Sequence, residues 1–319
     1  MLSLIALLTA GTPAYATPPR FEIRFSREAH ATPITGRLVL ALAKSARPEP
    51  RLAISPRGPA LFAIDLDQQA PDAPAVIDAR ATAYPRSLAE LPAGDYYAQA
   101  IVNVYEQVHR SDGKTIWVHM NDGSIEFFSI APGNLYSDPV LVHVAPDSVV
   151  KITITHKIDP EPRTPDTEWI KQVTIQSAML TKFWGRPIYV HASVLLPKGY
   201  NEHANVYYPS IYTLGHGETP LSFSTTPPRS GSPDSVNPAT GLSTGFATYN
   251  AWNSASYPRV IAITLQQQTP YFPDSYSVNS ANNGPYGDAI VQEVIPYLEE
   301  HFRIIRPTEN FGAFAQRMS

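Results

Sequence analysis

The chain has 319 residues, 43% of them hydrophobic, which is enough to bury the cores of two domains of ordinary size. Its 24 basic and 28 acidic side chains give a net charge of -4 with no run of like charge, which argues against a nucleic-acid partner. Cysteine is absent, which excludes disulfides, a thiol nucleophile and cysteine-ligated metals. We expect no cofactor and no metal site.

Residues 1–16 have the features of an export signal. An apolar stretch from Leu2 to Ala10 is followed by Ala14-Tyr15-Ala16, the small-x-small pattern that signal peptidase cleaves. No Lys or Arg precedes the stretch, so a buried first strand is the alternative interpretation. No later stretch approaches the ~20 apolar residues of a membrane span. The sequence therefore predicts an exported protein, periplasmic or secreted, without a membrane span.

Residues 17–158 have the pattern of an all-β domain. Short alternating runs, such as 37–42 and 61–66, are separated by turn residues, and two Asp-Gly turns divide the stretch from Tyr96 to Ile130 into a meander. Before it, residues 91–96 (Leu-Pro-Ala-Gly-Asp-Tyr) resemble the tyrosine corner of immunoglobulin-like sandwiches. The pattern predicts an immunoglobulin-like β-sandwich, closed by a proline-rich linker at 159–166.

Residues 167–319 have the pattern of an α/β domain. Strand-like runs alternate with loops, at 172–176, 188–196, 210–214 and 259–265, and two of these runs are continuously apolar. A helix is expected from Asp288, which can cap it, because apolar residues then recur at four-residue spacing: Ile290, Val294, Leu298 and Phe302. Pro296 should kink this helix.

From Trp169 onward the chain resembles the esterase D and enterochelin esterase-like family of the α/β-hydrolase superfamily, in its form with an N-terminal β-sandwich. The segments that carry the resemblance are 183–187 (Phe-Trp-Gly-Arg-Pro), 194–200, 208–212, Gly215-His216-Gly217 and, most specifically, 274–288. The resemblance implies an α/β-hydrolase domain that cleaves carboxylic esters by acyl transfer through a serine. It also implies that amides near His216, Gly217 and Glu218 hold the oxyanion; a plain glycine turn is the alternative.

The segment 274–288 joins the strand-like run 259–265 to the predicted helix, so it should lie over the carboxyl edge of the sheet. It offers carboxylate, amide and tyrosine hydroxyl groups within one loop, which suits a polar ester substrate. In the alternative interpretation these residues build turns and Asp288 caps the helix. The predicted substrate-binding residues are Asp274, Tyr276, Asn279, Asn282 and Tyr286.

The nucleophile has two candidates. The pattern Gly-x-Ser-x-Gly occurs around Ser243, but it precedes the run 259–265 and therefore comes one strand too early for this fold. The expected position lies on the strand after the helix, where Arg317-Met318-Ser319 would align Ser319 with the nucleophile and put Arg where Gly is needed. Because the chain stops there, we expect an incomplete hydrolase domain, truncated before or at the nucleophile and inactive as it stands.

The leading functional hypothesis is an exported serine esterase that would take a small-molecule ester if completed. One alternative is a non-catalytic binding or structural protein that acts through the sandwich, with Tyr105, Trp117 and Phe127 as a binding face. A second alternative is an active esterase that uses Ser243. The oligomeric state is not predicted.

Overall fold

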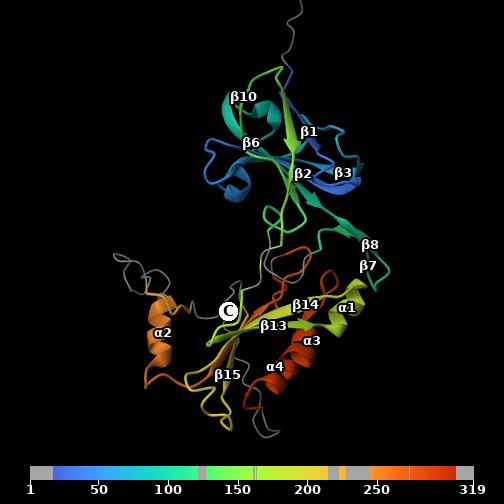
Figure 1. Cartoon of the computed structure of the whole chain (residues 1–319). Coiled ribbons are helices and arrows are strands. Elements are labelled where there is room, and N and C mark those ends of the chain that lie inside the picture. Colours follow the sequence, from blue (N-terminus) through green and yellow to red (C-terminus); the bar gives the residue numbers. More distant parts are fainter. Residues whose placement is uncertain are drawn as a thin grey trace, which may run out of the picture. The chain divides into compact units, whose positions relative to one another are not determined.

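A computed structural model describes residues 17–120, 127–160, 162, 164–214, 223–227, 245–272 and 274–306. The chain divides into two compact units: residues 1–104 with 133–158, and residues 105–132 with 159–319. Both units are built mainly on β-sheets (Figure 1). The predicted export signal lies outside the described residues. Within them, no helix has the length and apolar character that crossing a membrane requires.

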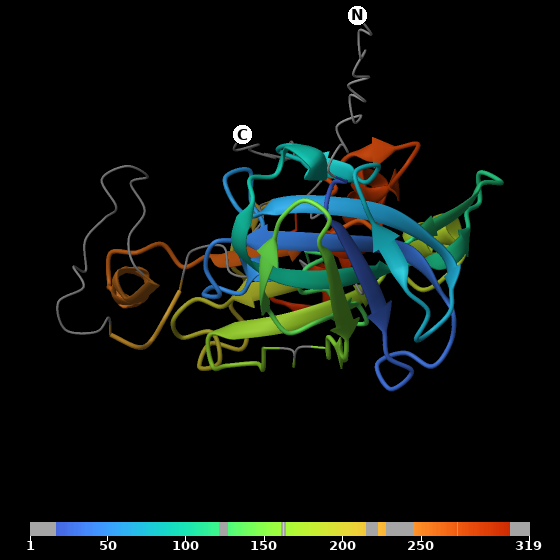
Figure 2. The ribbon, with the colours of Figure 1, turned by 90° about the horizontal axis from the view of Figure 1, so that it is seen from above.

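The first unit contains two described sheets. One has the order β11-β1-β4, and the other runs β12-β9-β6-β2-β3-β5 with β10 beside β6. The long strands β2, β3 and β6 lie side by side (Figure 2). The bounds are β1 Arg20–Phe25, β2 Ile34–Ala43, η1 Pro50–Ala53, β3 Ala60–Gln69, β4 Ala75–Ile77, β5 Thr82–Tyr84, η2 Leu88–Glu90, β6 Gly94–Val104, β9 Leu135–Tyr136, β10 Val140–Val144, β11 Val149–Ile154 and β12 His156–Lys157.

Alternate residues of both sheets meet in one core, so the first unit is a two-layer sandwich. Phe21, Ile23 and Phe25 of β1 pack into the same buried cluster as Leu38 and Leu40 of β2. The structure contains the hydrogen bond that a tyrosine corner would make. Tyr96 is buried, and its hydroxyl donates to the carbonyl of Pro92 at 2.9 Å.

The segment 105–132 departs from the predicted domain boundary. Strands β7 (Glu106–His109) and β8 (Thr115–Val118) form a hairpin whose Val108 and Val118 are buried in the core of the second unit. In the sequence the hairpin lies between β6 and β9, which both belong to the first unit. Because of this position, the meander pattern predicts that the hairpin is part of the sandwich. The third arm of that meander is not a strand over its described part, because residues 127–130 form a turn.

The second unit is organised around a sheet with the order β13-β14-β16-β15. Strand β14 is antiparallel to both of its neighbours, whereas β15 and β16 are parallel. The bounds are β13 Ile170–Gln176, β14 Tyr189–Leu195, β15 Ser210–Thr213 and β16 Ile261–Gln266. All four strand-like runs predicted from the sequence are therefore strands of one sheet.

Helices lie on both faces of this sheet (Figure 1). Helices α1 (Ala178–Trp184), α3 (Tyr286–Ala289) and α4 (Ile295–His301) cover one face, which Val190, Ile263 and Leu265 line. Helix α2 (Gly245–Asn253) covers part of the opposite face, where Trp252 packs against Leu195 and Ala262. The amphipathic pattern did not reveal α1 or α2, because each is short.

The predicted C-terminal helix exists, with a change of register inside it. Helix α3 continues through a π-helical turn, η3 (Ile290–Val294), into α4, and Ile290, Val294 and Leu298 are buried as expected. The π turn comes just before Pro296, where an α-helical hydrogen bond would lack its donor. The predicted cap is wrong: Asp288 lies in the first turn, and its amide is capped by Oδ1 of Asn279 at 3.0 Å. A carboxylate there still suits the positive end of the helix.

Candidate functional site

The carboxyl ends of β15 and β16 meet at the same edge of the sheet, because the two strands are parallel. In open α/β sheets ligands bind beyond this edge. The segment that leaves β16 there, residues 267–285, runs back to α3 and contains two short strands, β17 (Asn279–Ser280) and β18 (Gly284–Pro285). We call the described residues 267–272 and 274–285 the edge loop. It contains four of the five predicted substrate-binding residues; the fifth, Tyr286, follows it directly.

A buried polar network holds the first half of the edge loop. Nε2 of Gln267 donates to Oγ of Ser277 at 2.7 Å, and Oγ of Ser275 donates to Oε1 of Gln267 at 2.9 Å. The amide of Ser275 donates to the carbonyl of Gln267 at 3.0 Å. Gln267 and Ser275 are buried, so these hydrogen bonds satisfy groups that water cannot reach. The sequence signal that indicates this network is a polar run, Gln266 to Thr269, immediately after an apolar strand.

Two consecutive residues of the edge loop have left-handed backbone conformations. Tyr276 and Ser277 have φ angles of 53° and 54°. Such angles cost non-glycine residues on the order of 1–3 kcal/mol each and persist only where surrounding contacts impose them. Here Oδ1 of the buried Asp274 accepts the amide of Tyr276 at 2.6 Å. Asp274 therefore shapes the turn, and the turn presents the side chain of Tyr276, which is 70% exposed.

The other predicted substrate-binding residues divide by exposure. Tyr286 is fully buried and its hydroxyl donates to the carbonyl of Gln268 at 2.7 Å, so it is a core residue and not a contact for a ligand. Burial raises its pKa far above the ordinary value of a tyrosine. Asn279 and Asn282 are exposed, although Oδ1 of Asn279 caps the helix that follows. Tyr276, Asn279 and Asn282 are thus the predicted substrate-binding residues that lie at the surface.

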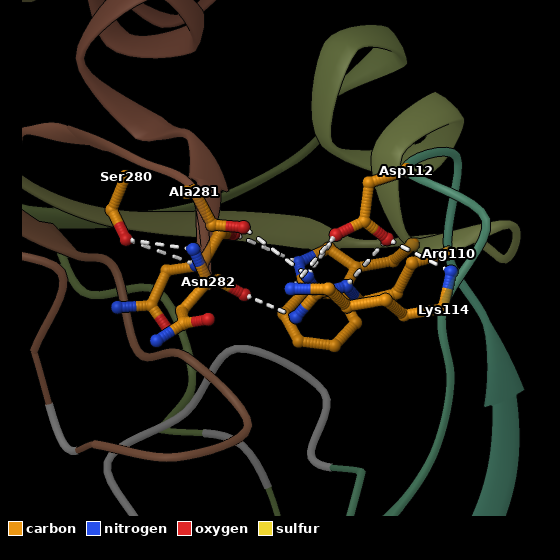
Figure 3. A network of polar contacts seen from close by, with 8 residues as sticks. Arg110, Asp112, Lys114, Ser280, Ala281 and Asn282 are labelled. Carbon is orange, nitrogen blue, oxygen red and sulfur yellow. Dashed lines mark hydrogen bonds and ion pairs between the residues drawn. The ribbon is translucent and has the colours of Figure 1, made fainter.

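The second half of the edge loop accepts hydrogen bonds from two residues distant in the sequence, Arg110 and Trp184. Two consecutive carbonyls, those of Ala281 and Asn282, accept hydrogen bonds from Arg110 at 3.2 and 3.0 Å, and the next carbonyl, of Asn283, accepts Nε1 of Trp184 at 3.0 Å. The amides of Asn282 and Asn283 both donate to Oγ of Ser280 at 3.1 Å (Figure 3). Arg110 lies on the β7–β8 hairpin, about 170 residues upstream, and the sequence carries no signal for this contact.

A band of polar side chains crosses the α2-side face of the sheet near the same edge. The strand register puts Gln172, Ser193 and Thr264 in one row, and Thr174 and His191 in the next. Ser193 donates to Oε1 of Gln172 at 2.8 Å, and Thr174 lies 3.0 Å from Nδ1 of His191. The buried hydroxyl of Thr264 has no hydrogen-bond partner among the described residues. An interior row of this kind suits a site that contacts polar groups.

The predicted catalytic residues lie outside the described part of the chain. This holds for Ser243, Ser319 and the oxyanion residues His216, Gly217 and Glu218. Leu214, the last described residue before the predicted oxyanion residues, follows the carboxyl end of β15. His301, at the end of α4, is exposed and stacks on Tyr297. Among the described residues, no three His, Cys, Asp or Glu side chains gather as a metal site.

No model of a protein family matches the sequence, and no curated protein matches it. Among solved structures, the chain is similar to the crystal structure of a thermostable esterase, with a TM-score of 0.24 and 9% identity. The match covers 92% of this chain and 68% of the other.

Proposed function

We propose that the second unit is the substrate-binding part of a serine-esterase-type α/β hydrolase that acts on carboxylic esters. The observation that carries the proposal is the strained, polar edge loop at the carboxyl end of the parallel pair β15 and β16. In α/β hydrolases the oxyanion amide comes from the loop between the third strand and the next helix. Strand β15 is the third strand of this sheet in chain order and α2 the next helix, so Gly215-His216-Gly217 falls in that loop.

Ester binding does not need the nucleophile, so binding is the direct test. The probe is p-nitroacetanilide, the amide counterpart of a p-nitrophenyl ester, observed by ligand-detected NMR with the full chain. Tyr276→Ala and Asn282→Ala should each weaken binding by about tenfold, the loss of one good contact. Gln107→Ala, an exposed position on β7, is the matched control and should bind like the unsubstituted protein. No binding by the unsubstituted chain would refute the proposal.

Ser243 is not the nucleophile in this proposal. Helix α2 begins at Gly245 and β16 follows it, so Ser243 precedes the fourth strand, whereas the resemblance puts the nucleophile on a strand after α4. Treatment with a fluorophosphonate and peptide mass mapping should leave Ser243 unmodified, and Ser243→Ala should change neither labelling nor hydrolysis of p-nitrophenyl acetate. Modification of Ser243 would support the alternative esterase that uses it.

For the first unit we propose an immunoglobulin-like sandwich, supported by the Tyr96 corner, in an exported protein. The alternative binding face of Tyr105, Trp117 and Phe127 loses support, because these residues lie in segment 105–132 of the second unit.

The surroundings of Thr17 support cleavage of the export signal after Ala14-Tyr15-Ala16. The amide of Thr17 donates to Oδ1 of Asp147 at 2.9 Å, so the terminal ammonium that cleavage creates there would face a carboxylate. Intact mass of the periplasmic protein should give Thr17 as the first residue; retention of residues 1–16 would contradict export.

A further inference from the structure

We propose that Arg110 is a positioning residue of the candidate ester site: from the β7–β8 hairpin, its guanidinium sets the path of the edge loop at residues 281–283 and thereby the place of Asn282. The inference rests on the proposed function of the edge loop. It adds to that function a residue from a hairpin that lies in the sequence between two strands of the first unit.

The Arg110 side chain is only 1% exposed, so its donors have to be satisfied inside the protein. Nε and Nη2 point to the carboxylate of Asp112, and Nη1 and Nη2 point to the carbonyls of Asn282 and Ala281 (Figure 3). Hydrogen bonding to Asp112 raises the pKa of Arg110, and the same contact lowers the pKa of Asp112. The group that contacts the edge loop is therefore the charged guanidinium of Arg110, paired with the carboxylate of Asp112.

Only the shape of a guanidinium explains these contacts together. Its planar fork reaches a carboxylate on one side and two successive carbonyls on another, and it lies 5.1 Å from the ring centre of Phe183. A lysine ammonium is a single point of charge on a flexible stem, so it keeps the charge and loses the geometry. The side chain thus does more than neutralise Asp112: it orients two successive peptide groups of the edge loop.

The hairpin is attached to the second unit by other contacts as well. The amide of Ser111 donates to the carbonyl of Phe183 at 2.8 Å, Glu106 pairs with Arg186 at 2.5 Å, and Val108 and Val118 lie in the core. Removal of the Arg110 guanidinium should therefore loosen the peptide groups of Ala281 and Asn282 while the hairpin stays docked. This separates a positioning role from a general contribution to stability.

The experiment compares hydrogen exchange of the Asn282 and Asn283 amides in the full-length protein and in Arg110→Lys, Arg110→Ala and Arg186→Ala. Exchange should accelerate by about tenfold or more in both Arg110 variants, because bonds from a charged donor are among the stronger ones. Arg186→Ala, which weakens only the docking of the hairpin, should leave it unchanged. Methylguanidinium at millimolar concentration should restore slow exchange in Arg110→Ala, and ethylammonium should not.

A second measurement links the position of the edge loop to the ligand. Arg110→Lys should weaken p-nitroacetanilide binding while its unfolding transition stays close to that of the unsubstituted protein, and it also serves if Arg110→Ala does not fold. Unchanged exchange in Arg110→Lys, or equal acceleration in Arg186→Ala, would overturn the positioning role. If exchange responds as expected but the unsubstituted protein binds no p-nitroacetanilide, the proposed function fails and the positioning of the loop stands.

Discussion

At Gly284 the edge loop lies directly against Phe183 of helix α1. Its φ is +95°, and a Cβ there would lie 2.8 Å from Cδ1 of Phe183. Gly113 has a similar φ of +81° with open space around it. Gly113→Ala should therefore lose only the conformational term, about 1 kcal/mol, and Gly284→Ala should lose a further ~1–3 kcal/mol from overpacking.

Urea unfolding followed by tryptophan fluorescence measures this difference. All four tryptophans, at 117, 169, 184 and 252, belong to the second unit, so the signal reports that unit alone. Equal losses in the two variants would show that the ring of Phe183 moves aside without cost.

Tyr212, on β15, makes the second unit sensitive to alkali. Burial, reinforced by the carboxylate of Glu299, raises its pKa from 10.0 to about 12. Between these values the unfolded chain loses the phenolic proton and the folded chain keeps it, so stability is complete below pH 10 and falls as the pH rises toward 12. Tyr212→Phe removes the titrating group and should reduce the loss of the urea midpoint between neutral pH and about pH 11. Tyr276→Phe, at an exposed position, should not.

At the scale of elements, the β7–β8 hairpin is expected to be dispensable for one unit and required by the other. The amide of Val104 donates to Oδ1 of Asn134 at 2.8 Å, so the chain ends that flank segment 105–132 are close. If a short Gly-Ser linker replaces that segment, the first unit should fold. The second should lose the burial of Val108 and Val118, about 3–6 kcal/mol, together with the Arg110 contact.

Circular dichroism and the fluorescence of the remaining tryptophans would separate these outcomes. We expect a retained β signal with red-shifted tryptophan emission. A blue-shifted, native-like emission would show that the second unit folds without the hairpin. Gln107→Ala and Thr115→Ala, which change exposed hairpin positions and leave Val108 and Val118 in place, are the matched controls.

The sequence predicts those elements whose residues repeat at a regular spacing. The four strand-like runs are confirmed as strands β13 to β16, and the stripe Ile290, Val294 and Leu298 is buried as expected. Strands β14 and β16 are buried along nearly their whole length, whereas Ile211 of β15 stays 49% exposed. The alternation of apolar and polar residues along a hairpin does not show which core the hairpin packs against. For this reason the sequence pattern places β7 and β8 in the sandwich, whereas Val108 and Val118 are buried in the core of the second unit. Helix α1 has only seven residues, too few for a periodic signal.

For the candidate site, the sequence indicates where a loop lies and not what each residue in it does. The segment 274–288 indicated a loop over the carboxyl edge of the sheet, and strand order agrees with that position. The role of each residue in this segment depends on its burial and its hydrogen bonds, which the residue type alone does not reveal. Tyr286 is a core residue, Asp274 shapes a turn, and Asn279 caps a helix. Gln267 and Arg110 were missed because one is a plain strand-end residue and the other lies on a distant hairpin.

At the scale of the whole molecule, the polypeptide passes between the two units three times, after Val104, after Pro132 and after Ile158. A protease that nicks the proline-rich segment 159–166 therefore severs one of three covalent tethers. The amino-terminal fragment stays bound to the carboxyl-terminal fragment, because its Val108 and Val118 are buried in the core of the second unit. After such a nick the two fragments should elute together in native gel filtration and separate only in denaturant, as the halves of a self-complementing split protein do.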